Sequence, residues 1–297
     1  MNAGSFTYLL FVISLVLFGT NGVVADGIHL PSTQIVVLRT FFGGLLLTAL
    51  LFLTRKRPRY PKQRVQMLYL LISGISMGVS WIFLYEAYVL IGVGMASMAY
   101  YCGPVLVMAL SPFVFNEKLS SKGVLGFIVV VFGAILLCIE AVGDGSDLLG
   151  YVYGFASAIA HAAMVVFSKL SKDIDGLENS SFQLVFSFIT VFVYALLTDD
   201  IPDSIPTGDW PYVLFLGFIS TGMGCFIYFS TITRLRAQTV SITGYLEPLS
   251  AVIFAALLLG EVMTPLQITG AVAILLGALY AEPHIGKKCS ANSTSAT

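Results

Sequence analysis

Four ionisable side chains lie inside long apolar segments of the sequence, where a charge is costly to place. They are Arg39, Glu86, His161 and Glu247. Ionisable groups inside a bilayer commonly mark a substrate or ion pathway, so each is a candidate functional residue. Arg39 lies about 7 residues into its segment, roughly 10 Å deep in a helix. It could bind a substrate carboxylate or belong to a gate; alternatively it forms a structural pair with Glu86 or snorkels to the surface.

His161 and Glu247 could instead handle protons. His161 is the only histidine within an apolar segment, where it could relay protons, bind substrate or form a hydrogen bond to a neighbouring helix. Glu247 precedes Pro248, which removes a backbone donor and disturbs the preceding turn. A carboxylate there could exchange protons in a coupled cycle, or it could be satisfied by the freed backbone groups. We therefore predict Glu247 and His161 as the proton-coupling candidates.

Aromatic residues supply a second kind of candidate. Their rings could stack on an amphipathic organic molecule and their hydroxyls could bind it, although interface anchoring and helix packing use the same residue types. Aromatic residues that could line a cavity are Trp81, Tyr85, Tyr88, Tyr100, Tyr101, Tyr228 and Tyr245, of which Trp81, Tyr101 and Tyr245 are the deepest. The predicted substrate-binding set is Trp81, Tyr101, His161, Tyr245, Arg39, Tyr85 and Tyr228.

The composition indicates a protein that crosses a membrane several times. Of 297 residues, 57% are hydrophobic and 10% are charged, against roughly a quarter charged in soluble domains. The net charge of −1 gives no reason to expect a nucleic-acid partner. Metal-ligand spacings and phosphate-binding glycine loops are absent from the sequence, so we expect no cofactor and no ATP-driven step. The expected partners are a lipid bilayer and a small-molecule substrate; the sequence leaves the oligomeric state open, and a monomer is compatible with it.

Ten apolar segments are long enough to cross a bilayer as helices, which requires about 20 residues each. Continuous apolar runs of this length favour helices over strands. The expected spans are 5–24, 32–54, 66–88, 95–115, 122–140, 150–170, 180–198, 210–232, 239–259 and 265–282. We expect N-caps at Ser120 and at Thr264, the latter followed by Pro265 at the first helical position.

Lysine and arginine sort to one side of these ten spans. The connections after even-numbered spans carry every basic residue except Arg39, whereas those after odd-numbered spans carry none. By the positive-inside rule, both termini lie in the cytoplasm, and we expect a multi-pass protein of the cell membrane.

One stretch of the chain occurs twice. Each copy places a proline in an apolar run, ends that run at a glutamate, and continues with two spaced glycines. All four pairs are 144 residues apart: Pro104 and Pro248, Glu117 and Glu261, Gly126 and Gly270, Gly133 and Gly277. A fixed offset indicates a repeat, and we predict five-helix units at 5–140 and 150–282, with a disordered cytoplasmic tail at 283–297. We expect both glutamates to be structural, at helix ends on the surface.

Five helices per unit is an odd number, so the second unit would enter the membrane from the opposite side. Inverted repeats of this kind are common in secondary transporters, because two antiparallel copies can exchange conformations. The sequence therefore predicts an all-α membrane protein of ten helices in two inverted repeats.

These features resemble the EamA family of the drug/metabolite transporter superfamily. The resemblance is carried by the duplicated proline–glutamate–glycine block, by Arg39-Thr40-Phe41-Phe42 and by Leu246-Glu247-Pro248, and covers residues 5 to 282. It implies ten helices, two inverted repeats, and export of amino acids or other small metabolites. Family members often carry tryptophan late in the first helix of each half, where this chain has Phe18-Gly19 and His161-Ala162.

The leading hypothesis is a secondary-active exporter of amino acids or other small organic metabolites, working by alternating access. The alternatives are an intramembrane enzyme and a receptor that transports nothing. Gly74-Ile75-Ser76-Met77-Gly78 matches a hydrolase nucleophile pattern, and His161 could in principle activate Ser76. That pattern requires a strand–turn–helix setting, whereas here it falls within a predicted helix, so we expect no enzymatic activity.

Overall fold

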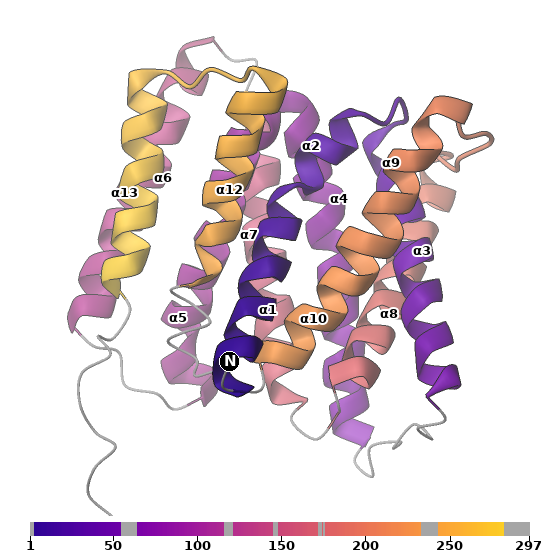
Figure 1. Ribbon diagram of the computed structural model, residues 1–297. Coiled ribbons are helices and arrows are strands. Elements are labelled where there is room, and N and C mark those ends of the chain that lie inside the picture. The colour runs from indigo at the N-terminus through magenta and orange to yellow at the C-terminus, as the bar shows by residue number, and fades with distance from the viewer. Residues whose placement is uncertain are drawn as a thin grey trace, which may run out of the picture.

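The computed structural model describes residues 3–54, 64–115, 121–144, 148–171, 174, 176–232 and 243–281. Within these ranges the chain is helical and contains no strand (Figure 1). Several expectations fall outside them: the N-cap at Ser120, the position of Glu117, the 283–297 tail and most of the basic connections.

The first half of the chain forms six helices up to the central link. They are α1 (Ala3–Gly19), α2 (Asn21–Asp26), α3 (Ser32–Leu53), α4 (Arg64–Tyr100), α5 (Cys102–Phe115) and α6 (Ser121–Asp144). The second half continues with α7 (Leu148–Leu170), α8 (Gly176–Leu197), η1 (Thr207–Asp209), α9 (Trp210–Leu214), η2 (Phe215–Met223), α10 (Gly224–Ile232), α12 (Leu246–Phe254), η3 (Ala255–Leu259) and α13 (Pro265–Ala281). The elements η2 and η3 are π-helical turns within longer helices.

Six helical segments of the described chain are long and apolar enough to cross a membrane. One of them, Arg64–Val107, has 44 residues, about twice the length that one crossing needs. The sequence predicted two spans here, and the backbone at Gly92 (φ 77°, ψ 165°) interrupts the helix between them. Three shorter apolar helices lie at Ser121–Leu136, Leu246–Leu259 and Pro265–Gly277. The protein is therefore a multi-pass membrane protein, and large exposed apolar side chains such as Phe113 (84% exposed) suit contact with lipid.

Glycines allow helices of the two halves to approach closely. A Cβ at Gly133 of α6 would lie 2.7 Å from the carbonyl oxygen of Gly270 in α13. Reciprocally, a Cβ at Gly277 of α13 would lie 3.0 Å from the carbonyl oxygen of Gly126 in α6. These two helices lie side by side at one edge of the bundle (Figure 1). Small residues at such a crossing let backbones pack in van der Waals contact, which is a main source of helix association in lipid.

A second glycine pair joins α4 to α8. A Cβ at Gly74 or at Gly78 would lie 3.0 Å from a carbonyl oxygen of α8. Two buried hydrogen-bonded contacts accompany this packing: Ser73 Oγ to Gln183 Oε1 (2.9 Å), and Ser80 Oγ with Ser157 Oγ of α7 (3.1 Å). Polar contacts of this kind between apolar helices fix the register in which the helices pack.

The start of α13 confirms the cap predicted at Thr264. The backbone N–H of Gln267 donates to Thr264 Oγ1 (3.2 Å), and the backbone N–H of Thr264 donates to Gln267 Oε1 (2.9 Å). This reciprocal pair is a capping box with Pro265 at the first helical position. The preceding helix ends at Leu259, where Gly260 adopts φ 70°, so Glu261 lies in the connection between helices rather than at a helix end.

Candidate functional site

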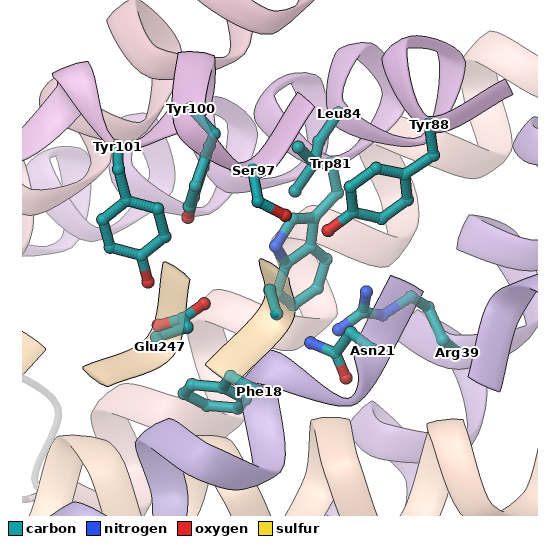
Figure 2. A pocket seen from close by; sticks show the side chains of 11 residues that line it. Phe18, Asn21, Arg39, Trp81, Leu84, Tyr88, Ser97, Tyr100, Tyr101 and Glu247 are labelled. Atoms are coloured by element: carbon teal, nitrogen blue, oxygen red, sulfur yellow. The ribbon is translucent and has the colours of Figure 1, made fainter. Parts of the chain in front are cut away.

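A small polar cavity lies between the two halves of the bundle, and Figure 2 shows the side chains that line it. Its lining is Phe18, Asn21, Arg39, Trp81, Leu84, Tyr88, Ser97, Tyr100, Tyr101, Glu247 and Ala251. Its volume is about 20 Å³, which suits ordered water and not a metabolite. The structure therefore represents a state in which this site is closed.

Irregular turns in three helical segments lie next to the cavity. Thr20 separates α1 from α2, Tyr101 separates α4 from α5, and a turn at Tyr245 precedes α12. Tyr101 and Tyr245 are equivalent positions in the repeat, 144 residues apart. Interrupted helices at matching places in two halves are a characteristic of transporter binding sites, because freed backbone groups and helix ends then face the substrate.

Arg39 is the most deeply buried charge at the site, with 2% of its surface exposed. Its Nε donates to Thr221 Oγ1 of η2 at 3.0 Å, and its Nη1 donates to the Tyr85 hydroxyl. The guanidinium carbon lies 4.2 Å from the ring centre of Trp81, a cation–π geometry. Nη2 has no hydrogen-bond partner. A buried guanidinium with an unused donor at a cavity wall suits an anionic ligand.

The structural alternative for Arg39, a pair with Glu86, is wrong. Glu86 accepts a hydrogen bond from Ser32 Oγ of the same half, while Arg39 bonds Thr221 and Tyr85. Snorkelling is excluded as well, because the guanidinium is held by these neighbours and buried. Ser32 and Arg39 lie seven residues apart on α3, about two helical turns, so Glu86 and Arg39 find their partners at different depths.

Glu247 lies at the other end of the cavity, directly before Pro248. The Tyr101 hydroxyl points toward its carboxylate (Figure 2). Glu247 and Arg39 line the same cavity yet form no ion pair with each other. The indole of Trp81 stands between them in Figure 2. The site thus presents a positive and a negative group that are separated by an aromatic surface.

His161 lies one layer behind the cavity wall. Its Nδ1 lies 2.5 Å from the Tyr100 hydroxyl, with ring centres 4.7 Å apart. Tyr100 lines the cavity and His161 does not, so any influence of the histidine would pass through that tyrosine. No hydrogen bond joins His161 to Ser76, and the dyad considered for an enzyme is not formed.

The remaining predicted residues divide between the wall and the surrounding layer. Trp81 and Tyr101 line the cavity, as Arg39 and Glu247 do. Tyr85 supports Arg39 from behind, with 2% of its surface exposed. Tyr228 packs against the cavity residue Phe18, with ring centres 5.8 Å apart, and Tyr245 is buried in the main apolar core.

Sequence reasoning missed several residues of the lining. They are Phe18, Asn21, Leu84, Ser97 and Ala251. Tyr88 and Tyr100, which were among the aromatic residues expected to line a cavity, do line it. Asn21 is a polar residue in a predicted span, and that was a signal that could have identified it.

Polar contacts between the halves close one end of the bundle. The Glu261 carboxylate accepts the backbone N–H groups of Val93 (2.7 Å) and Gly94 (2.9 Å) at the kink after Gly92. At the same end, Gln34 Nε2 donates to Asp200 Oδ1 at 2.8 Å. This end carries the loop before α3 and the loop between η3 and α13, opposite the N-terminus in Figure 1.

A pair formed by the exposed His29 and the buried Asp209 lies at the same end. His29 Nδ1 lies 3.0 Å from Asp209 Oδ1, and the His29 backbone N–H donates to Asp209 Oδ2 at 2.7 Å. The hydrogen bond and the charge of Asp209 raise the pKa of His29 above 6.5, with a smaller contribution from Asp26. Protonation of His29 therefore strengthens a contact between the first and second halves.

A larger groove, of about 430 Å³, lies between α5, α6 and α7. Its lining is almost wholly apolar, including Leu106, Phe127, Val131, Ile135 and Phe155. Such a surface suits hydrocarbon chains. It offers no group for a polar metabolite, so the smaller cavity with Arg39 and Glu247 is the better functional candidate despite its volume.

Comparison with known proteins finds a family and relatives that match over most of the chain. The family model described as "EamA-like transporter family" matches residues 5–139 and again 148–281. An "Uncharacterized transporter YoaV" of Bacillus subtilis is 26% identical over 84% of this chain and 87% of its own length. A "Probable amino-acid metabolite efflux pump" of Escherichia coli is 27% identical over 91% of this chain and 92% of its own length.

A solved crystal structure has a similar fold. Its TM-score is 0.68, and the match covers 93% of this chain and 96% of the other at 18% sequence identity. At this identity the likeness shows the fold alone. Both of these sequence relatives carry the names of transport proteins.

Proposed function

Because the chain belongs to the EamA-like transporter family and is a membrane transporter, we propose that it exports amino acids or related small zwitterionic metabolites. The observation that carries this proposal is the pair of separated charges in one cavity. Arg39 offers an unused donor to a carboxylate, and Glu247 offers an acceptor to an ammonium group. Trp81 lies between them, where it can contact a side chain or an aliphatic backbone.

The proposed architecture is ten spans in two inverted five-helix repeats, at 5–140 and 150–282. The six long apolar helices, the interruption of one of them at Gly92 and the three shorter apolar helices support this number. The reciprocal contacts of Gly133 with Gly270 and of Gly277 with Gly126 support a two-fold relation, because each contact maps onto the other under the 144-residue offset. Both termini are proposed to be cytoplasmic and the host membrane to be the cell membrane.

The proposed mechanism is alternating access by rocking of the two halves around the cavity. The contacts of Glu261, Asp200 and Asp209 with the first half support a state closed at the outer end. Glu247 binds either a proton or the substrate ammonium, which would couple export to proton entry. His161 could adjust this exchange through Tyr100. Facilitated transport without protons is the alternative, and a pH gradient distinguishes the two.

The test is release of a preloaded mixture of amino acids, nucleosides and sugars from proteoliposomes, read by mass spectrometry. Selective loss of amino acids is expected, with acceleration when protons can flow inward. Glu247→Gln should remove the acceleration by pH, and Arg39→Ala should stop release. Asp203→Asn serves as the matched control, because Asp203 is exposed and away from the cavity.

His161→Ala in the same assay separates a proton relay from a supporting role. A relay predicts loss of pH dependence, whereas support of Tyr100 predicts a weaker but still pH-dependent release. Selective release of nucleosides or sugars in place of amino acids would refute the proposed substrate class. No release by folded protein under any gradient would refute transport by this cavity.

A further inference from the structure

Asn21 lies where the first span is interrupted, and its side chain enters the cavity. α1 ends at Gly19, and α2 begins at Asn21. The interruption is tightly packed: a Cβ at Gly19 would lie 3.0 Å from the carbonyl oxygen of Glu247, and one at Gly22 would collide with Val93. Asn21 is 9% exposed and lines the cavity. Its position is therefore determined by both halves of the bundle.

The Asn21 amide is oriented by a residue of the second half. Ser220 Oγ donates a short hydrogen bond to Asn21 Oδ1. Ser220 is fully buried, and its other neighbouring acceptor, the Leu17 carbonyl oxygen, is farther away at 3.4 Å. With the amide oxygen occupied, the NH2 group of Asn21 has two donors to offer. Neither donates to another described residue.

This amide lines the same cavity as the guanidinium of Arg39, and the two groups are drawn next to each other in the view of Figure 2. Arg39 Nε donates to Thr221 and Nη1 donates to Tyr85, while Nη2 has no partner. Two nitrogens with unused N–H groups, one on a charged group and one on a neutral amide, therefore belong to one small cavity of about 20 Å³. A carboxylate has two acceptor oxygens and fits paired donors, particularly where one is cationic.

We propose that Asn21, oriented by Ser220, determines specificity by binding the carboxylate of the substrate together with Arg39. This inference rests on the proposed function of the cavity as the transport site. Arg39 supplies the charge, and Asn21 supplies the second donor that distinguishes a carboxylate from a group with a single acceptor. Ser220 acts as a positioning residue, because it touches Asn21 and does not line the cavity.

Binding can be measured without transport, because the chain has two tryptophans, Trp81 and Trp210. Trp81 lies in the cavity, whereas Trp210 is 39% exposed and outside it. In a Trp210→Phe background, the fluorescence of Trp81 reports occupancy. The probes are a mixture of the common amino acids other than tryptophan and tyrosine, which themselves fluoresce, and a matching mixture of the amines that their decarboxylation yields.

Asn21→Leu should weaken binding of the amino acids about tenfold or more, the usual effect of removing one hydrogen bond to a charged group. It should leave binding of the amines within about twofold. Ser220→Ala should shift amino-acid binding in the same direction but less, since the amide remains and loses only its orientation. Ser187→Ala is its matched control, because Ser187 is equally buried and lies outside the cavity.

Equal losses for amino acids and amines would overturn the role of Asn21 in carboxylate recognition, as would an unchanged amino-acid affinity. If the wild-type protein binds only the amines, this inference is overturned, and the cavity is then a site for cationic substrates. A folded wild-type protein that binds neither mixture would overturn the proposed function itself. Asn21→Asp, which keeps the size of the side chain, should repel amino acids more strongly than Asn21→Leu and guards against loss of folding as the explanation.

Discussion

The carboxylate of Glu261 is predicted to hold the outer end of the protein closed. It accepts two backbone N–H groups from the first half, from Val93 at 2.7 Å and from Gly94 at 2.9 Å. In Glu261→Gln, one oxygen remains as an acceptor, but an NH2 group replaces the other and faces a backbone donor. The change removes the charge and one of the two hydrogen bonds while keeping the size of the side chain.

The magnitude follows from the two contacts. Hydrogen bonds to a charged group contribute about 1.5–3 kcal/mol each, and Glu261 is only half-buried, so we take a loss of about 2 kcal/mol for the pair. If these hydrogen bonds break when the outer end opens, the substitution destabilises the closed state and leaves the free energy of the open state unchanged. At about 1.4 kcal/mol per factor of ten, the open population increases roughly 30-fold.

Labelling of a cysteine in the cavity measures this population. Ser97 is buried and lines the cavity, so Ser97→Cys in a background without the four native cysteines should react slowly with a membrane-impermeant maleimide applied to intact cells. Glu261→Gln should accelerate labelling by about 10-fold to 30-fold. Asp203→Asn, which neutralises an exposed carboxylate at the same end, should not.

An unchanged labelling rate in folded Glu261→Gln would refute the reasoning. It would mean that the contacts with Val93 and Gly94 persist when the outer end opens, so that they shape the kink at Gly92 without acting as a closure. A slower rate would mean that the same contacts favour the open state.

Three further predictions use the same preparations. Asp209 raises the pKa of His29, so the stabilisation of the closed end is complete below about pH 6.5 and is lost as the pH rises through the raised pKa. Labelling of the cavity cysteine should therefore increase over that pH window, and His29→Gln should remove this pH dependence. Gly133→Val should lower the melting temperature in detergent, since its Cβ would lie 2.7 Å from the Gly270 carbonyl oxygen and overpacking costs about 1–3 kcal/mol; an unchanged melting temperature would contradict the close approach of α6 and α13. Arg39→Lys keeps the charge but not the fork of donors, and should reduce amino-acid release at least tenfold; wild-type release would show that charge alone suffices.

Much of the organisation of this protein could be predicted from local features of the sequence. Apolar runs of about 20 residues predict membrane helices, and six long apolar helices of this kind are present. The cap at Thr264 was predicted from two adjacent residues, and the hydrogen bonds with Gln267 confirm it. Arg39 and Glu247 were identified as candidates because a charge in an apolar run is costly wherever the chain folds.

The partners of those charges could not be predicted, because they come from distant parts of the chain. Arg39 bonds Thr221, 182 residues away, and His161 contacts Tyr100, 61 residues away. A sequence reveals the depth of a residue in its helix, but the direction its side chain faces depends on which helices pack around it. The pairing of Arg39 with Glu86, which the sequence left open as an alternative, is not formed for this reason.

The sequence by itself determined that the chain crosses a membrane and repeats at an offset of 144 residues, and it identified the ionisable residues buried within its spans. These properties depend on composition and spacing alone. Only the tertiary structure decided that Asn21 lines the same cavity as Arg39, that Glu261 caps Val93 and Gly94, and that His161 stays behind Tyr100. Each of these depends on how the helices are rotated and where they are interrupted, which is set by packing between halves that are far apart in the sequence.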